Sequence, residues 1–373
     1  MTLPNAPVSV QWEPRGTATA AVTLANRSVP MVLDTGFPRT AIAANAAGGL
    51  DLSSVSLSFA GALAGPMPVQ WLLSGLGPAG VLGSDVLHQL PLLLDPVART
   101  AEVLPAFLPP ASETLLRLAD PGACAGGATD RRAPLFFVTA NVEGEVVDLV
   151  VDTGAEMTFI STDLASRLGS RPTLGLIRVA SGFAGIFTAR AVRARLLEVG
   201  SARVVTPALL SSAEVDAELA RLTRAVAATT HCNPNASCSA SPTFDGFLGW
   251  TFLREFKVSL AEGSPYGERR LGLERPAGAG LALRDFVGVG WNASASDSPP
   301  GLRVDSFLSV SPAEDAGVKV GDVVTAIDGQ PAATVSPPYA AAGTKVKLAL
   351  VRDAAALELD VTVADLLADP PVP

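Results

Sequence analysis

The first hundred residues show short alternations of apolar and polar positions, broken repeatedly by glycine, proline and asparagine. A period of two residues is typical of strands that bury one face. We expect strands at Val8–Trp12 and Ala21–Leu24, with a turn at Asn26–Ser28. The pattern therefore predicts a segment rich in β-structure from Val8 to Leu104.

The same order of elements restarts in the middle of the chain. A proline-rich stretch, residues 105–110, first interrupts the pattern and is typical of a linker. Two apolar runs, 135–142 and 146–151, then flank a Glu-Gly-Glu turn and predict a hairpin. Further on, Ser211 and Glu214 match a capping box, which predicts the start of a helix. Its apolar face is predicted to contain Val215, Leu219, Leu222 and Val226.

The last hundred residues follow a different pattern. Gly301–Val304 reads as a strand, and a short helix is expected to end at Gly317. A turn at Gly321-Asp322 then leads into a further strand. We therefore expect three domains, with boundaries at residues 1–108, 109–276 and 277–373.

The most informative feature is a tripeptide that occurs twice, each time behind an apolar run and ahead of an apolar-apolar-Gly triplet. The first copy pairs Asp34-Thr35-Gly36 with Val81-Leu82-Gly83, and the second pairs Asp152-Thr153-Gly154 with Phe247-Leu248-Gly249. Two carboxylates that meet in one cleft can share a proton and activate water, whereas one alone does much less. The alternative is that both aspartates only cap turns.

Each residue type in the repeat suits this chemistry. The aspartate places a carboxylate at the end of a strand, and the glycine allows the tight turn that follows. The threonine hydroxyl can form a hydrogen bond to a partner loop. The downstream triplet allows another segment of the chain to pass close behind the loop.

These motifs resemble those of the aspartic proteases. Val151–Glu156 followed by Phe247–Gly249 resembles a retropepsin-type domain, and the first segment resembles a second, reduced copy. Two copies in one chain resemble the fused arrangement of pepsin-like enzymes. The resemblance implies a mainly β fold, with two β-barrel lobes related by a pseudo-two-fold axis. It also implies an aspartic endopeptidase that needs no cofactor.

The resemblance assigns roles to the repeated tripeptides. Asp34 and Asp152 would form the catalytic dyad. Thr35, Gly36, Thr153 and Gly154 would support the two loops. Polypeptides would be the substrates, and the two lobes of one chain would form the active unit, so a monomer is favoured.

The first segment departs from the family pattern. Phe37-Pro38 stands where a small residue is usual. The spacing from Asp34 to Gly83 is about half that of the second copy and leaves no room for a flap hairpin, so that Val55–Phe59 is expected to lead straight to Val69–Leu72. Two alternatives follow: a catalytically inactive peptide-binding scaffold, or an enzyme active only as a homodimer that pairs Asp152 with Asp152 of a second chain.

The second segment has a candidate flap at residues 180–188. Gly182, Phe183, Gly185 and Phe187 are its candidate substrate-binding residues. The two phenylalanines would cover a bound substrate. The alternative is that both are ordinary core aromatics.

The third segment resembles a PDZ domain, through Ser311–Ala313, Ala316–Val318 and Gly321–Val324. A PDZ groove binds an extended peptide by strand addition, with backbone N–H groups holding the terminal carboxylate. The candidate loop for peptide C-termini comprises Phe286, Val287, Gly288 and Val289. The alternative is a PDZ domain that only packs on the protease lobes.

Charge and composition exclude several other functions. A net charge of −9 and a pI near 4.9 argue against binding to nucleic acid or to an anionic membrane surface. The longest apolar region, residues 81–94, contains Asp85, His88 and Pro91 and makes a poor membrane span. The chain has only two histidines, His88 and His231, so we expect no metal site.

The cellular compartment stays open. Asn26, Asn235 and Asn292 each begin an Asn-x-Ser triplet, which leans towards a secreted, periplasmic or lumenal location. No signal peptide is visible in the first residues. Cys232 and Cys238 lie in one polar loop and could close a small disulfide or remain free thiols.

Overall fold

The strands β2 (Ala18–Leu24) and β3 (Arg27–Leu33) near the start of the chain form a hairpin, as the alternating pattern predicts. In β2 Val22 and Leu24 are buried, whereas Ala21 and Thr23 are exposed. The turn into β3 is made by Ala25 and Asn26, both with positive φ, as two-residue hairpins require. Strand β2 begins at Ala18 and not at the predicted Ala21. The turn begins at Ala25, one residue before the predicted Asn26.

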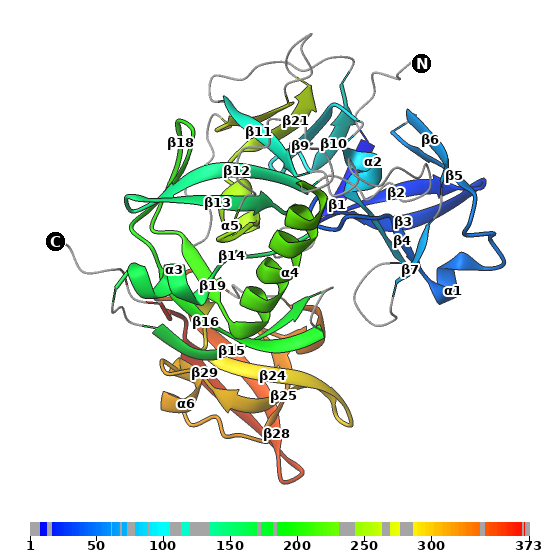
Figure 1. Cartoon of the computed structure of the whole chain (residues 1–373). Coiled ribbons are helices and arrows are strands. Elements are labelled where there is room, and N and C mark those ends of the chain that lie inside the picture. The colour runs from blue at the N-terminus through cyan, green and yellow to red at the C-terminus, as the bar shows by residue number, and fades with distance from the viewer. Residues whose placement is uncertain are drawn as a thin grey trace.

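The computed structural model of the chain is mainly β (Figure 1). It describes residues 8–12, 17–60, 62–67, 69–72, 79–88, 90–104, 113–119, 135–169, 173–181, 185–230, 243–262, 269–276, 286–335, 340–367 and 369. Three parts are named below by their residues: the first unit (8–104), the second unit (113–276) and the C-terminal unit (286–369).

The first unit continues from the hairpin through short strands and two single-turn helices. Besides β2 and β3 its elements are β1 (Val8–Trp12), β4 (Ala41–Ala43), α1 (Ala44–Ala47), β5 (Val55–Phe59), β6 (Ala62–Met67), β7 (Gln70–Leu72), β8 (Gly80–Leu82), α2 (Ser84–Leu87), β9 (Leu92–Asp95) and β10 (Thr100–Val103). Strand β8 runs parallel to β3 and antiparallel to β4, and β4 runs parallel to β7. Asp34 thus directly follows the end of β3, which pairs with β8.

The second unit repeats this order of strand pairings. Its elements are β11 (Glu113–Ala119), β12 (Leu135–Val142), β13 (Glu145–Val151), β14 (Thr158–Ile160), α3 (Thr162–Arg167), β15 (Thr173–Ser181), β16 (Gly185–Arg193), β17 (Leu196–Val199), β18 (Ala202–Val205), β19 (Ala208–Ser211), α4 (Ala213–Thr230), β20 (Gly246–Leu248), α5 (Trp250–Leu253), β21 (Lys257–Glu262) and β22 (Arg269–Glu274). Strand β20 runs parallel to β13 and antiparallel to β14, and β14 runs parallel to β19. Asp152 therefore occupies the position in the second unit that Asp34 occupies in the first.

Two insertions distinguish the second unit. The hairpin β15–β16 follows α3, and helix α4 separates β19 from β20. The helix is capped by Ser212, whose Oγ accepts from Val215 N at 3.2 Å, and not by the predicted Ser211. Val215, Leu219 and Leu222 are buried as the periodicity predicts, whereas the side chain of Val226 lies outside the described residues.

The first unit lacks a counterpart of β15–β16 within its described residues. Residues 48–54, between α1 and β5, contain no strand. We predicted that β5 leads straight to residues 69–72, and this was wrong: β5 is followed by β6 and pairs with it. This hairpin matches β17–β18, because β5 pairs with β2 as β17 pairs with β12.

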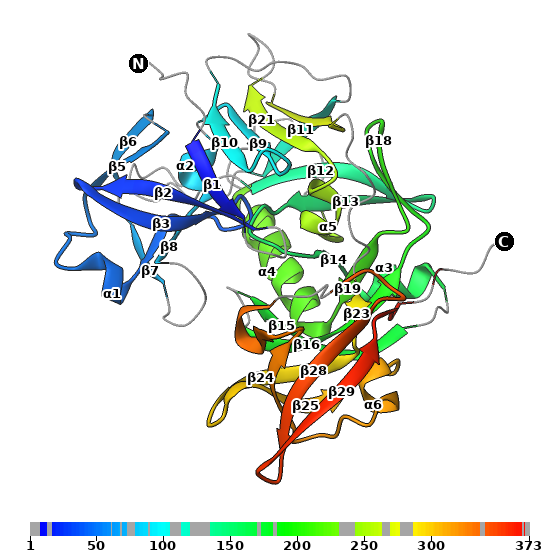
Figure 2. The same ribbon diagram turned by 180° about the vertical axis from the view of Figure 1, so that it is seen from behind.

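A six-stranded antiparallel sheet joins the two units. Its order is β1-β10-β9-β21-β22-β11, so that β9 of the first unit pairs with β21 of the second. Figure 2 shows β9, β10, β11 and β21 of this sheet together at the top of the molecule. One apolar core continues through both units and includes Leu33 and Leu82 with Val151 and Leu248.

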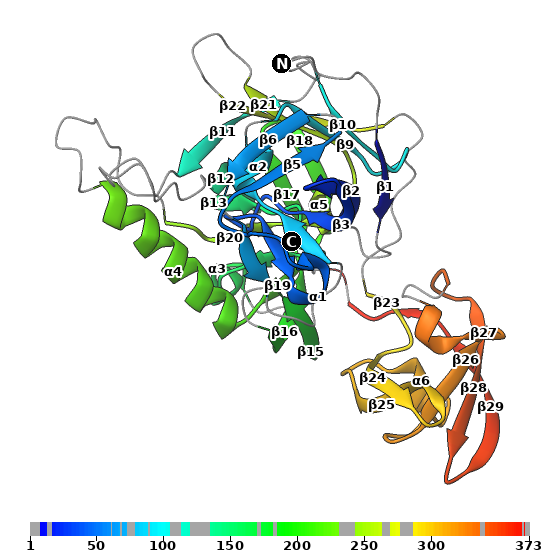
Figure 3. The same cartoon turned by 90° about the vertical axis from the view of Figure 1, so that its right-hand side faces the viewer.

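The C-terminal unit is a small sheet with one short helix. Its elements are β23 (Val287–Gly288), β24 (Trp291–Asp297), β25 (Pro300–Phe307), α6 (Pro312–Asp315), β26 (Val323–Ile327), β27 (Gln330–Pro331), η1 (Ala332–Thr334), β28 (Lys345–Arg352), β29 (Ala355–Thr362) and β30 (Ala364–Asp365). The strand order is β24-β25-β26-β28-β29, with β27 beside β26. Helix α6 is capped by Ser311 and is followed by Gly317 at a φ of 95°, where the sequence predicts its end. Figure 3 shows this unit projecting from the rest of the molecule.

Within the part of the chain that the structure describes, no helix combines the length and the apolar character needed to cross a bilayer.

Candidate active site

The two Asp-Thr-Gly loops meet where the two units face each other. Each aspartate donates its backbone N–H across to the parallel strand: Asp34 N to Leu82 O, and Asp152 N to Leu248 O, both at 3.0 Å. Leu82 and Leu248 belong to the apolar-apolar-Gly triplets that the sequence singled out. The triplets therefore fix the start of both loops in the same way.

The two threonines tie the loops together with four reciprocal hydrogen bonds. Thr35 Oγ1 donates to Val151 O at 2.7 Å and accepts from Thr153 N at 3.1 Å. Thr153 Oγ1 donates to Leu33 O at 2.7 Å and accepts from Thr35 N at 3.0 Å. Both threonine side chains are fully buried. Because every partner is a backbone group of the opposite unit, this arrangement sets the distance between the loops.

Each loop glycine lies directly against the carboxylate of the other loop. A Cβ atom added to Gly36 would lie 2.3 Å from Asp152 Cγ, and one added to Gly154 would lie 2.2 Å from Asp34 Cγ. Real Cβ atoms essentially never approach another atom so closely. Glycine is therefore required at both positions for this close approach, whatever the backbone angles.

Backbone N–H groups hold the inner oxygen of each aspartate. Asp34 Oδ1 accepts from Gly36 N and from Phe37 N, both at 2.9 Å. Asp152 Oδ1 accepts from Gly154 N at 2.9 Å, and the backbone of Ala155 also forms a hydrogen bond to this carboxyl. Phe37 thus supplies the same N–H as Ala155, so the Phe37-Pro38 departure does not remove a contact to Asp34.

The carboxyl groups of Asp34 and Asp152 form a hydrogen bond with each other. Burial raises the pKa of Asp34, and the hydrogen bonds from Asp152 and from the loop backbone oppose part of that rise. The pKa of Asp152 is raised well above its ordinary value by burial, by the charge of Asp34 and by the shared hydrogen bond. The pair therefore favours one proton shared between the two carboxyl groups.

A second layer of residues, which the sequence did not single out, supports the loops. In the first unit Thr40 Oγ1 accepts from Gly83 N at 3.1 Å and donates to Asp85 Oδ1 at 2.7 Å. In the second unit Thr158 Oγ1 accepts from Gly249 N at 3.1 Å and forms a hydrogen bond with Thr251 Oγ1 at 2.8 Å. Asp85 and Thr251 each stand two residues after the triplet glycine. That shared offset was a signal the sequence offered.

The two positions that follow the triplet glycines by two residues, Asp85 and Thr251, differ in charge. Asp85 accepts from both Thr40 N and Thr40 Oγ1, and burial raises the pKa of its carboxyl. In the second unit the smaller hydroxyl of Thr251 accepts from Thr158 N at 2.9 Å. The two units thus hold equivalent loops with different side chains.

Trp250 braces the second loop from below. Its Nε1 donates to Thr153 O at 2.6 Å, and its backbone N donates to Ala155 O at 2.9 Å. The buried ring meets Trp12 edge to face, with centroids 4.7 Å apart. A residue of β1 therefore supports the loop of the second unit.

The candidate flap corresponds to hairpin β15–β16. Its tip, with Gly182 and Phe183, lies outside the described residues, and Gly185 is the first residue of β16. Phe187 is only 5% exposed and packs near Phe159, with ring centroids 6.3 Å apart. This burial fits the alternative in which Phe187 is a core aromatic.

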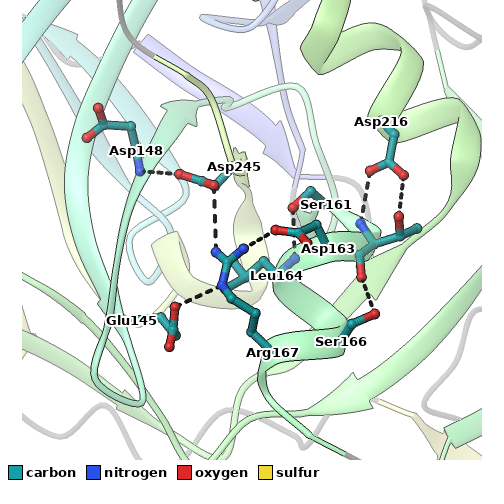
Figure 4. A network of polar contacts seen from close by, with 10 residues as sticks. Glu145, Asp148, Ser161, Asp163, Leu164, Ser166, Arg167, Asp216 and Asp245 are labelled. Carbon is teal, nitrogen blue, oxygen red and sulfur yellow. Dashed lines mark hydrogen bonds and ion pairs between the residues drawn. The ribbon is translucent and has the colours of Figure 1, made fainter.

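A polar network holds both ends of helix α3 and joins it to β13, the strand that leads to Asp152 (Figure 4). Arg167 contacts Glu145 at 2.9 Å, Asp245 at 4.0 Å and also Asp163. Asp245 accepts from Asp148 N at 3.0 Å, which joins the network to β13. The N-terminus of α3 is held by Asp216 of α4, which accepts from Thr162. The insert helix is therefore tied to the elements around the second loop.

The candidate peptide loop of the C-terminal unit contacts the second unit. Val287 and Gly288 pair with β30, and Phe286 O accepts from Leu366 N at 2.8 Å. Phe286 packs against the same apolar cluster as Ile177 and Val179 of β15. Val289 is buried and its carbonyl accepts from Ala313 N.

The described residues contain no group of three or more His, Cys, Asp and Glu side chains suited to holding a metal ion. His88 contacts Ser84 O through Nδ1 at 2.6 Å. Cys232, Cys238 and His231 lie outside the described residues, so the disulfide stays a prediction.

Comparisons with known proteins identify two domains. Residues 138–252 match the family model described as aspartyl protease, and residues 309–352 match that of the PDZ domain. A solved PDZ domain protein from Parabacteroides distasonis is 25% identical over 21% of this chain and 20% of that chain, with a TM-score of 0.18. The chain thus covers about a fifth of that relative. A comparison with curated proteins gives no match. The protein carries an aspartyl protease domain and a C-terminal PDZ domain.

Proposed function

We propose that the protein is an aspartic endopeptidase whose catalytic dyad is Asp34 and Asp152. The observation that carries this proposal is the mutual hydrogen bond of two carboxyl groups, each lying against the glycine of the other's loop. Two carboxylates in such contact cannot both ionise easily, and the pair is suited to hold one proton at the working pH.

In the proposed chemistry the two carboxyl groups share one proton, which is written here on Asp152. Ionised Asp34 takes a proton from a bound water while the water oxygen attacks the scissile carbonyl carbon. At the same time Asp152 donates its proton to the carbonyl oxygen. In the tetrahedral intermediate Asp34 then gives its proton to the peptide nitrogen while the C–N bond breaks. Asp152 recovers a proton from one hydroxyl, which leaves a carboxylic acid, an amine and the original dyad.

The three predicted domains take matching roles in this proposal. Residues 1–108 and 109–276 would be retropepsin-like lobes that each supply one aspartate, and residues 277–373 would be the PDZ domain. The pairing of equivalent strands in the two units supports the lobe assignment. The PDZ domain would recruit polypeptide tails, with Phe286–Val289 as the proposed loop for a terminal carboxylate.

The contact between Asp34 and Asp152 favours the single chain as the active unit. A homodimer that paired Asp152 with Asp152 would have to displace Asp34 and break the four threonine hydrogen bonds. The inactive scaffold loses part of its motivation, because Phe37 N supports Asp34 as Ala155 supports Asp152.

A peptide-library digest from acid to neutral pH tests the proposal. We expect hydrolysis by the wild type and a loss of at least about 1,000-fold in kcat for Asp34→Asn and Asp152→Asn. Asp51→Asn, an exposed aspartate in a turn of the first unit, is the matched control and should keep full activity. Full hydrolysis by Asp34→Asn alone would favour the homodimer. Full hydrolysis by both variants, or none by the wild type, would reject the proposed dyad.

A further inference from the structure

The edge of β15 that does not pair with β16 lies against strand β24 of the C-terminal unit (Figure 1). On its other side β15 pairs with β16. Asn292, near the start of β24, donates from Nδ2 to Leu176 O at 3.2 Å and accepts at Oδ1 from Arg178 N at 3.2 Å. Its carboxamide therefore takes the two backbone groups that a neighbouring strand would otherwise pair with.

A charged contact reinforces this amide bridge. Arg178 Nη1 donates to Asp305 Oδ2 at 2.7 Å, and Asp305 Oδ1 accepts from Ser294 Oγ at 2.9 Å. Asn292 is itself held in place, because its Nδ2 also donates to Ser306 Oγ at 3.0 Å. The side chains of Arg178 and Asp305 are 42% and 30% exposed, so the ion pair is partly screened by water. Its geometry nevertheless fixes the same strand at the same residue as the amide.

An apolar contact lies behind the polar one. Leu308, Leu366 and Leu367 of the C-terminal unit are buried in the cluster that contains Phe187 of β16. Ile177 of β15 packs against that cluster, as does Phe286. The two units therefore share a packed interface under the hairpin.

The base of the hairpin is anchored as well. Arg193, the last residue of β16, is only 2% exposed, and its Nη2 contacts Asp365 Oδ1 at 2.9 Å. Its Nε donates to Leu367 O at 3.1 Å and its Nη1 to Thr206 O at 3.1 Å. This buried arginine, with a partner on each of its three nitrogens, joins the hairpin and the rest of the second unit to the C-terminal unit.

We propose that Asn292 and Asp305 are positioning residues for peptide hydrolysis, which hold strand β15 of the candidate flap in place from the PDZ domain. This inference rests on the proposed function and extends it, because it makes the PDZ domain a structural part of the active site. Within its described residues the first unit shows no counterpart of this hairpin, which makes β15–β16 the candidate flap.

Hydrogen exchange tests the docking without requiring activity. In Asp305→Asn and in Asn292→Ala we expect the amides of residues 173–181 and 185–193 to exchange about fivefold faster, the factor that corresponds to losing one ordinary hydrogen bond. Glu358→Gln is the matched control: it breaks the exposed Lys347–Glu358 ion pair of the same unit, far along the chain from β24. Its flap should exchange as in the wild type.

Steady-state kinetics test the positioning role. A flap holds the substrate in the ground state and in the transition state alike, so loosening it should raise KM at least about threefold with kcat almost unchanged. The charge exchange Arg178→Asp with Asp305→Arg should restore both the exchange rate and KM. Glu358→Gln should alter neither.

Each outcome decides one part of the inference. Unchanged flap exchange in Asp305→Asn and Asn292→Ala would overturn the docking. Faster exchange with wild-type KM would show that the contact is structural only and overturn the positioning role. A wild type that hydrolyses no peptide would remove the proposed function and the positioning role together, while the exchange data would still decide whether the flap is docked.

Discussion

Adding one methyl group to a loop glycine should displace a carboxylate of the dyad without substituting either aspartate. In Gly154→Ala the new Cβ would lie 2.2 Å from Asp34 Cγ, whereas ordinary Cβ contacts begin at 3.4 Å. Asp34 must therefore move by about 1.2 Å, or the second loop must retreat by the same amount. The four threonine hydrogen bonds resist a movement of the loops, so most of the shift falls on the carboxylate.

The displacement sets the size of the effect. A misplacement of about 1 Å in a reacting group can cost about 100-fold in rate. We expect kcat/KM for a cleaved peptide to fall by about that factor, equivalent to about 2.7 kcal/mol of transition-state stabilisation. Overpacking should also lower the free energy of unfolding by about 1–3 kcal/mol. Peptide hydrolysis and urea denaturation of the same preparation measure the two quantities.

Gly144→Ala separates the local effect from a general loss of stability. Gly144 has a φ of 98° in the β12–β13 turn, so alanine there is strained by about 1–2 kcal/mol, but its Cβ would meet no atom within 4 Å. This variant should be destabilised by a similar amount and keep wild-type kcat/KM. If Gly154→Ala is folded and retains more than half of the wild-type kcat/KM, the close approach of the two loops is refuted.

Two further predictions concern the same loops. Thr35→Val removes a hydroxyl that both donates to Val151 O and accepts from Thr153 N, so the free energy of unfolding by urea should fall by about 3 kcal/mol. The control Thr35→Ser keeps the hydroxyl and should stay within about 1 kcal/mol of the wild type. Equal losses in both variants would contradict the cross-link. The folded-state pKa of Asp152 is raised, so its stabilising contribution is complete at low pH and is lost as the pH rises through that pKa. Asp152→Asn should therefore melt at a higher temperature than the wild type at pH 7, with the difference vanishing towards pH 3; a difference in Tm that does not change with pH would argue against a coupled dyad.

The sequence predicted the features that local residues determine. An apolar run followed by Asp-Thr-Gly ends a strand in a tight turn, and the apolar-apolar-Gly triplet lies behind it as predicted. The family match over residues 138–252 confirms that this pattern marks an aspartyl protease domain. The insert helix was predicted from its periodicity, and its cap was misplaced by one residue because Ser211 and Ser212 both carry a hydroxyl.

Other features depend on contacts between residues far apart in the sequence. The β5–β6 hairpin was missed because Ala60 adopts a φ of 50° there, a conformation that alanine rarely signals. The pairing of Thr40 with Asp85 needs two segments to be folded together before it can form. The same holds for Asn292 and β15, whose contact joins two domains that a local pattern treats separately.

The six-stranded sheet between the units has a consequence for how the site assembles. In a subunit dimer, the encounter of two loops is bimolecular, and dilution separates them. Here β9 pairs with β21 within one chain, so the loops face each other at an effective concentration set by covalent connection. The two halves then no longer need to be identical, and the second can retain a hairpin and a helix that the described residues of the first do not show. Under the proposed function, a peptide between these unequal halves would meet a site with a direction, because reversing its backbone would exchange the side of the candidate flap hairpin for the side whose described residues show none.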